Sequence, residues 1–133
     1  MSRIKGKRVL ITGGASGIGR LMGETAQEKG AAALVIWDIN QENIDATVQE
    51  LGRKGTVHGY RVDVSRHEAV AECYAKVKKE VGDVDILINC AGIITSNKTF
   101  DQCTEEEIDR TMAVNAIAPM YVALQALPDM KRR

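Results

Sequence analysis

The fold of this chain is decided by Thr12-Gly-Gly-Ala-Ser-Gly-Ile-Gly19, in which glycines at 13, 17 and 19 lie between an apolar run and a helical pattern. Glycine suits such a loop because the chain turns sharply, lets a pyrophosphate approach the backbone, and packs a helix closely on a sheet. The first N–H groups of that helix then face the anion. A lone glycine-rich stretch can also be a flexible turn, so its surroundings decide.

Four short apolar runs alternate with longer stretches of helical periodicity on either side of this loop. The expected strands are residues 9–11, 34–37, 57–62 and 85–89, and the expected helices between them are residues 18–29, 40–51 and 65–81. This alternation predicts βαβ units and a parallel sheet. Right-handed crossovers order the strands 3-2-1-4, the first half of a Rossmann-type, doubly wound α/β sheet whose carboxy-terminal half is absent.

Capping residues indicate where the helices begin and end. Asn40 is the expected N-cap of one helix, and Gly30 is a C′ residue of another. Ser65-Arg-His-Glu68 and Thr104-Glu-Glu-Glu107 have the spacing of capping boxes. Pro119 interrupts the last helical stretch, and we expect a kink or a junction of two helices near Asn115.

Size and composition predict one soluble domain, residues 1–133. Hydrophobic residues make up 44% of the chain, and no linker or low-complexity tract divides it. Lys plus Arg and Asp plus Glu number 18 each, so we expect no basic field for nucleic acid or anionic lipid, and a small-molecule partner instead. No signal peptide or membrane span is evident. Three cysteines without a CxxC pair predict reduced thiols in the cytoplasm and no metal site.

Asp38 ends the second expected strand, 19 residues after Gly19, close to the roughly 20 of dinucleotide-binding proteins. An acid there accepts hydrogen bonds from the adenosine ribose hydroxyls. It would repel a 2′-phosphate by about 4 kcal/mol for charges about 4 Å apart at an effective dielectric of about 20, which favours NAD over NADP. The alternatives are a solvated strand-end residue or another N-cap, and the nearby Arg20 would moderate the preference by neutralising a phosphate.

Five motifs occur in the order and at the intervals typical of one family, and the chain resembles the amino-terminal portion of classical short-chain dehydrogenases/reductases. The motifs are the loop from Thr12 to Gly19, Asp38-Ile39, Asp63-Val64, Asn89-Cys-Ala-Gly92 and Asn115. The resemblance implies that Asn115 belongs to the catalytic tetrad. It also implies a set of cofactor-binding residues, namely Thr12, Gly13, Ser16, Gly17, Ile18, Gly19, Asp38, Ile39, Asp63, Val64, Asn89, Ala91 and Gly92. Cys90 departs from the family's usual second asparagine.

The resemblance implies an NAD-dependent oxidoreductase that transfers hydride between NAD and an alcohol or carbonyl substrate. The family's catalytic serine and Tyr-x-x-x-Lys pair follow the fourth strand, so we expect them beyond residue 133 and the chain to be catalytically incomplete. Tyr74-Ala-Lys-Val-Lys78 has the pair's spacing but precedes the fourth strand. We therefore interpret Tyr74 as a partly packed residue and Lys78 as an exposed one.

Two alternatives stay open at this stage. One is a non-catalytic NAD-binding or regulatory module complete at 133 residues, and the other is a methyltransferase-like nucleotide binder, which uses a similar acid after the second strand. Strand 85–89 would lie at a bare edge and the last helix is apolar, so we expect association, as in a homo-oligomer, or aggregation, or a missing partner segment. The stretch Val35-Ile-Trp-Asp-Ile-Asn40 resembles the branch of the family that acts on steroids and retinoids, although the substrate stays open.

Overall fold

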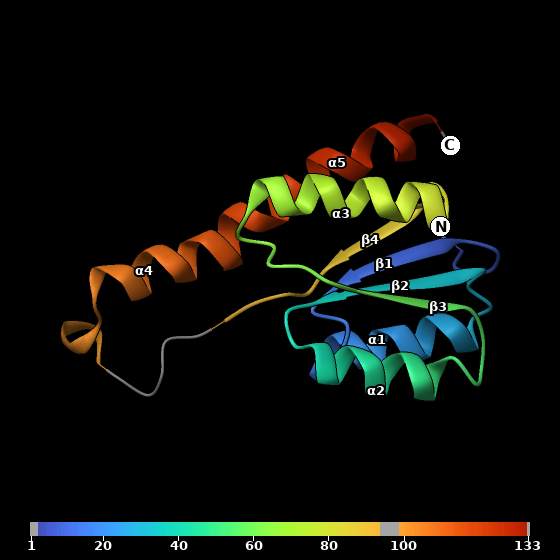
Figure 1. Ribbon diagram of the computed structural model, residues 1–133, viewed down its shortest axis with the longest axis horizontal. Helices are drawn as coiled ribbons and strands as arrows, with labels where there is room; N and C mark the ends of the chain where they lie inside the picture. Colours follow the sequence, from blue (N-terminus) through green and yellow to red (C-terminus); the bar gives the residue numbers. More distant parts are fainter. Residues whose placement is uncertain (1–2, 94–98, 133) are drawn as a thin grey trace.

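A four-stranded parallel sheet forms the centre of the computed structural model, which describes residues 3–93 and 99–132 (Figure 1). The strands are β1 (Arg8–Thr12), β2 (Ala33–Asp38), β3 (Val57–Arg61) and β4 (Ile86–Asn89). Their order, β3-β2-β1-β4, confirms the predicted topology. Thr12 pairs with Trp37 on one side and with Asn89 on the other, so three strands end at the same level.

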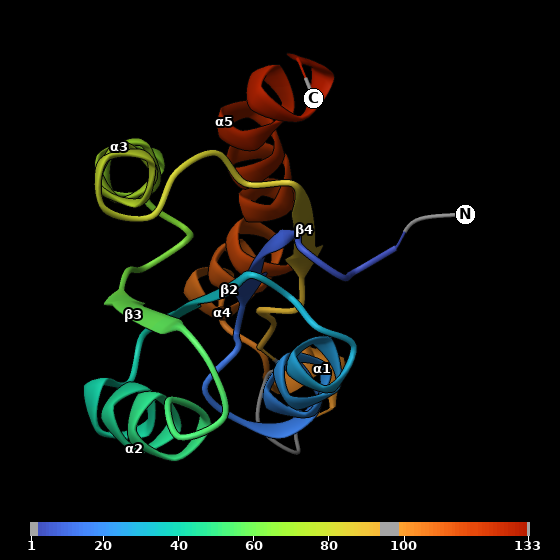
Figure 2. The same cartoon turned by 90° about the vertical axis from the view of Figure 1, so that its right-hand side faces the viewer.

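Helices cover both faces of the sheet (Figure 2). Helices α1 (Gly17–Glu28) and α2 (Gln41–Leu51) lie on one face, and α3 (His67–Glu80) and α5 (Ala118–Arg132) lie on the other. Alternate residues of β1 and β2 therefore enter two separate cores: Val9, Ile11, Leu34 and Ile36 pack toward α1 and α2, whereas Leu10, Val35 and Trp37 pack toward α3 and α5. Burial on both faces explains why these strands are apolar at consecutive positions.

Two of the three predicted N-caps are confirmed. The Asn40 Oδ1 atom accepts a hydrogen bond from the Asn43 N–H at 2.9 Å, and the Thr104 hydroxyl accepts one from the Glu107 N–H at 3.1 Å. The capping box at Ser65 is wrong, because α3 begins at His67 and the Ser65 hydroxyl donates to the Asp63 carboxylate at 2.6 Å. The nearby carboxylate is the stronger acceptor and takes the hydroxyl away from the helix.

The last helical stretch is built in three pieces, which confirms the expected junction near Asn115. Helix α4 (Glu105–Met112) follows a short 3-10 turn (Phe100–Gln102) and continues through a π-helical turn (Ala113–Ile117) into α5. Pro119 has no N–H to offer the Asn115 carbonyl, and a widened turn accommodates this missing bond. Helix α4 projects beyond the sheet in Figure 1. None of the helices in residues 3–93 and 99–132 has the length and apolar character needed to cross a bilayer.

Candidate functional site

A cleft of about 360 Å³ lies at the carboxyl ends of the strands, where β1 and β4 are neighbours. This is the switch point at which open α/β sheets bind their ligands. Most of the residues predicted to bind the cofactor line it: Gly13, Ser16, Gly17, Ile18, Gly19, Asp38, Ile39, Asp63, Val64, Ala91 and Gly92. The structure thus brings four separate motifs to one cavity.

The loop glycines at 13, 17 and 19 each have a separate geometric reason. Gly13 has φ +68°, and a Cβ there would lie 2.9 Å from the Ala91 backbone. A Cβ on Gly19 would overlap the Gly13 carbonyl oxygen. Gly17 has φ +53°, but a Cβ there would meet no atom within 4 Å. Gly13 and Gly19 therefore allow close packing within the protein, whereas Gly17 faces open space at the cleft.

Thr12 shapes the cleft without lining it. The side chain is buried, and its hydroxyl accepts hydrogen bonds from the Cys90 N–H at 3.1 Å and the Ala91 N–H at 3.2 Å. These bonds fasten the end of β1 to the segment after β4 and so fix the width of the cleft. The loop is held from the other side by Thr47 of α2, whose hydroxyl donates to the Ala15 carbonyl at 3.2 Å.

Asp38 connects the end of β2 to the glycine loop. One carboxylate oxygen accepts the Ala15 N–H at 3.1 Å, and the other accepts the Ile39 N–H at 2.8 Å. The first oxygen keeps one lone pair, which is enough for one ligand hydroxyl. Arg20 is held elsewhere, by an ion pair with Glu50 and a longer one of 3.9 Å with Glu24.

Asp63 and Arg110 both line the cleft, and Arg110 was not among the predicted site residues. The Asp63 carboxylate accepts hydrogen bonds from the N–H and hydroxyl groups of Ser65, and Arg110 of α4 lies 3.8 Å from its other oxygen. Burial alone would raise the pKa of Asp63, but the Ser65 hydrogen bonds and the charges of Arg110 and Arg66 lower it below its usual value. Asp63 therefore carries a negative charge at neutral pH.

Five more lining residues fall outside the predicted set: Trp37, Val62, Cys90, Ile93 and Val114, in addition to Arg110. Most of them are next to a predicted site residue in the sequence, and this position is the only sequence feature that could have identified them. Arg110 and Val114 are one helical turn apart on α4 and the π-helical turn, so they share a face. No local pattern indicated that this face would turn toward the cleft.

Two predicted asparagines lie beside the cleft and are not part of its lining. The Asn89 amide donates to the Pro119 carbonyl at 3.4 Å, which ties β4 to the start of α5. Asn115 makes a two-way contact with Ile93, accepting from its N–H at 2.8 Å and donating to its carbonyl at 2.7 Å. Both side chains hold the segment after β4 against the last helices.

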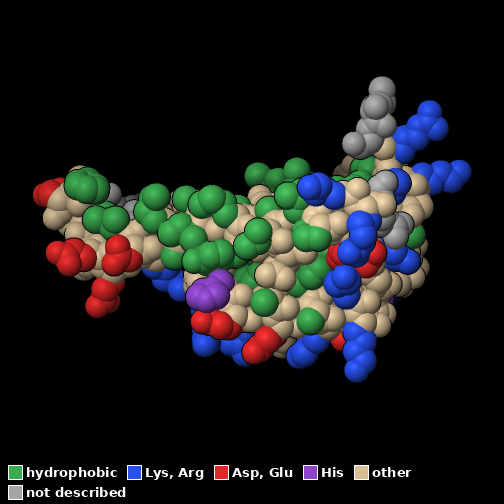
Figure 3. Space-filling model, turned by 90° about the horizontal axis from the view of Figure 1, so that it is seen from above, with side chains coloured by type: hydrophobic (Ala, Val, Ile, Leu, Met, Phe, Trp, Pro, Cys, Tyr) green, Lys and Arg blue, Asp and Glu red, His purple; other side chains and the backbone are tan. Residues whose placement is uncertain are grey.

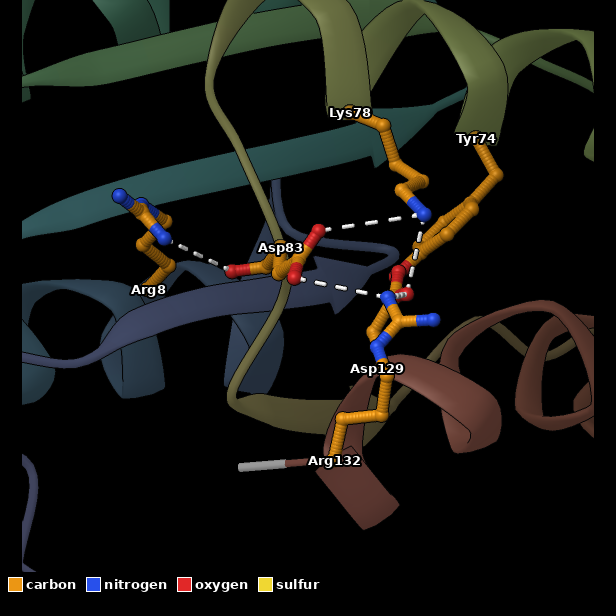
Figure 4. Close-up of polar contacts among 6 residues, drawn as sticks. All are labelled: Arg8, Tyr74, Lys78, Asp83, Asp129 and Arg132. Atoms are coloured by element: carbon orange, nitrogen blue, oxygen red, sulfur yellow. Dashed lines mark hydrogen bonds and ion pairs between the residues drawn. The ribbon is translucent and has the colours of Figure 1, made fainter.

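The Tyr74–Lys78 pair is not part of the cleft, and both side chains point from α3 toward Asp129 of α5 (Figure 4). The Tyr74 hydroxyl donates to Asp129 of α5 at 2.7 Å, and the Lys78 ammonium lies 3.0 Å from the other carboxylate oxygen. Arg132 also pairs with Asp129. Tyr74 is only 3% exposed, more deeply packed than expected, and burial with the Asp129 contact raises the pKa of its hydroxyl. The pair joins α3 to α5.

Comparisons with known proteins agree with this geometry. The family model described as short chain dehydrogenase matches residues 7–133, and the chain belongs to that family. It is 43% identical over 129 residues to epidermal retinol dehydrogenase 2 of Mus musculus, covering 96% of this chain and 41% of that protein. It is 39% identical to estradiol 17-beta-dehydrogenase 11 of Rattus norvegicus, covering 97% and 43% respectively.

A solved structure with a similar fold is that of L-sorbose reductase from Gluconobacter frateurii complexed with NADPH and L-sorbose. It superposes with a TM-score of 0.89 at 30% identity, covering 98% of this chain and 49% of that one. The chain thus spans about two-fifths of the length of the curated relatives, and the part that it matches is their amino-terminal Rossmann half.

Proposed function

We propose that this chain forms the NAD-binding part of an oxidoreductase that transfers hydride between NAD and an alcohol or carbonyl substrate. The observation that carries the proposal is the open space in front of Gly17 at the start of α1. Ser16, the N-cap of α1, makes no side-chain capping bond, so the first N–H groups of the helix are left for an anion such as a pyrophosphate.

The charges around Asp38 support NAD over NADP. The carboxylate of Asp38 is at the cleft and retains capacity for a ribose hydroxyl, whereas a 2′-phosphate there would meet a negative charge. Arg20 is already paired with Glu24 and Glu50, and it does not line the cleft. Arg20 therefore neutralises the two glutamates and not a phosphate in the cleft.

The carboxylate of Asp63 is suited to the adenine end of the cofactor. It carries a negative charge, and its oxygens can accept a hydrogen bond from an exocyclic amine. NAD, when bound, would supply the hydride chemistry. Asn89, through Pro119, and Asn115, through Ile93, would keep the segment after β4 in position.

We propose that Asn115 also contributes to proton transfer, since the π-helical turn and Pro119 leave its backbone carbonyl without the usual helical donor. The family's serine, tyrosine and lysine would come from residues beyond 133. A non-catalytic NAD-binding module is the alternative, and the commitment of Tyr74 and Lys78 to Asp129 favours it for the 133 residues taken alone.

We infer an apolar alcohol or carbonyl substrate, because the relatives are named for retinol and estradiol. We also propose a homo-oligomer, since large apolar side chains are exposed along α4, the π-helical turn and α5: Ile108, Met112, Ile117, Met120 and Leu124. The free thiols of Cys73, Cys90 and Cys103 suit a reducing compartment such as the cytoplasm.

Calorimetric titration of NAD, NADP and S-adenosylmethionine tests the proposal. Wild-type protein should bind NAD most tightly, and Gly17→Ala should weaken binding at least tenfold because the new methyl group enters the ligand's space. Gly6→Ala is the matched control: Gly6 also has a positive φ, +76°, and open surroundings, but lies far from the cleft. Equal NAD affinity in wild type and Gly17→Ala would contradict the proposed site, and preferred binding of S-adenosylmethionine would contradict the proposed class. Following NADH formation with a retinol substrate then separates an enzyme from a binding module.

A further inference from the structure

The fold separates the charges of this chain, although their sum is zero. In Figure 3, Lys and Arg side chains gather at the end of the molecule that holds both termini, and Asp and Glu side chains gather around α4 at the other end. A net charge of zero therefore does not exclude a local basic field on one part of the surface. A local patch attracts counter-charges within about 10 Å whatever the distant charges are.

The basic end has a simple origin in the topology. The strands begin, and helices α1, α2, α3 and α5 end, at the same side of the sheet, so residues far apart in sequence meet there (Figure 1). Eight exposed cations define this basic end: Arg3, Lys5, Lys7, Lys29, Arg53, Lys54, Lys79 and Lys131. Of these, Lys79 and Lys131 lie in the last turn of a helix, where the helix dipole favours a cation. Lys29 is the C-cap of α1, and Arg53 and Lys54 follow the C-cap of α2, so the helix dipole favours them as well, whereas Arg3, Lys5 and Lys7 precede β1 and follow no helix.

Nearby acids neutralise the basic end only in part, because the eight cations outnumber Glu28 and Glu80, the exposed acids that adjoin Lys29 and Lys79. Asp83 and Asp129 have their own cations, since Lys78 and Arg132 pair with both, and the Arg8 guanidinium donates to the Asp83 carbonyl (Figure 4). Within residues 3–93 and 99–132, the eight cations of the basic end have no ion-pair partner. They are free to meet anions from outside the molecule.

We propose that the basic end docks on an anionic lipid surface of the phosphatidylserine type. Single-stranded nucleic acid fits less well, because stacking on its bases needs exposed aromatic rings. Trp37 and Tyr74 are buried, Phe100 and Tyr121 lie outside this end, and Tyr60 is half-buried with its hydroxyl on Glu80. Half-buried Ile4 lies between Arg3 and Lys5, and Leu127, 51% exposed, precedes Lys131 by one turn. Cations mixed with apolar side chains are typical of surfaces that lie in a lipid interface.

Docking in this way sets the orientation of the cleft. The cleft is at the carboxyl ends of the strands, opposite the basic end, so it would face the aqueous side, where a soluble dinucleotide is found. The acidic α4 would also face away from the anionic surface, which prevents repulsion. The inference is independent of the proposed NAD site, because no residue of the basic end lines the cleft.

Co-sedimentation with vesicles tests the proposal. The full chain is mixed at about 0.1 M salt with vesicles of phosphatidylcholine alone or with about 30% phosphatidylserine. The double variant Lys7→Gln/Lys131→Gln removes two cations of the basic end. Arg61→Gln/Arg66→Gln is the matched control, because it changes the net charge equally at the carboxyl ends of the strands. Each lost cation should weaken binding about fivefold, so the first variant should bind about 25-fold more weakly than wild type.

The proposal predicts binding to the phosphatidylserine vesicles only, a loss in the basic-end variant, and little change in the control variant. Absence of vesicle binding would overturn it, as would equal losses in the two variants. Tighter binding to a 20-base-pair DNA duplex than to the vesicles would assign the surface to nucleic acid instead and also overturn it. NAD titration of the wild type and of the Lys7→Gln/Lys131→Gln variant is a separate readout, so failure of the proposed site would be distinguished from failure of the docking surface.

Discussion

Replacing Asp129 should be among the most destabilising single changes in the last helix. The carboxylate is 2% exposed and accepts the Tyr74 hydroxyl at 2.7 Å. A hydrogen bond from a buried group to a charged partner contributes about 1.5–3 kcal/mol. The ion pair with Lys78 adds less than about 1 kcal/mol, because the lysine side chain is 41% exposed and screened by water. Asp129→Ala should therefore lower the free energy of unfolding by about 2–4 kcal/mol.

Urea denaturation, followed by far-ultraviolet circular dichroism, measures this loss and divides it among the partners. Tyr74→Phe should cost about 1.5–3 kcal/mol, and Lys78→Met no more than about 1 kcal/mol. None of the three changes should alter NAD affinity, because the cluster is remote from the cleft. If Lys78→Met were as costly as Asp129→Ala, or if Asp129→Ala cost less than about 0.5 kcal/mol, the assignment of the energy to the Tyr74 contact would be refuted.

The remaining predictions concern acid stability, the cleft and a buried thiol. The pKa values of Asp63 and Asp129 are lowered in the folded chain. The two carboxylates therefore stabilise the fold above the unfolded carboxyl pKa of about 3.9, and this stabilisation is lost as the pH falls through their folded pKa values. Asp129→Asn should flatten the acid limb of a stability–pH curve measured by denaturation. Asn115→Ala leaves the Ile93 N–H and carbonyl without their partner and should cost about 1–2 kcal/mol in the same assay, with weaker NAD binding by titration. Burial raises the pKa of Cys73 to about 12, so thiol labelling read by mass spectrometry should leave this cysteine unmodified until the chain unfolds.

The order of the elements could be predicted because each βα unit carries its own local signals. Gly30 adopts φ +85° after α1, and Asn40 caps α2, as the residue types indicated. The predicted cap at Ser65 was wrong because the capping pattern does not take account of residues outside it, such as Asp63. The Ser65 hydroxyl had two acceptable uses, and the choice depended on Asp63 being turned toward it by the end of β3.

The candidate site was predictable to the extent that its residues lie at strand ends. Parallel strands bring their carboxyl ends together, so Gly13, Asp38, Asp63 and Ala91 had to be neighbours once the strand order was known. Arg110 was not predictable in this way. It reaches the cleft from α4, whose direction depends on the π-helical turn and on packing between distant segments.

The hydrogen bonds of the glycine loop also couple the cleft to the sheet. The N–H groups of Gly13 and Gly14 donate to the Trp37 carbonyl, and that of Ala15 donates to Asp38, so three successive loop amides are held by β2. Native-state hydrogen exchange of these amides therefore requires the end of β2 to separate from the loop. A ligand that binds only the closed loop would slow their exchange by a factor of one plus the ratio of the free ligand concentration to Kd, so the exchange rates of these three amides would report how fully the cleft is occupied.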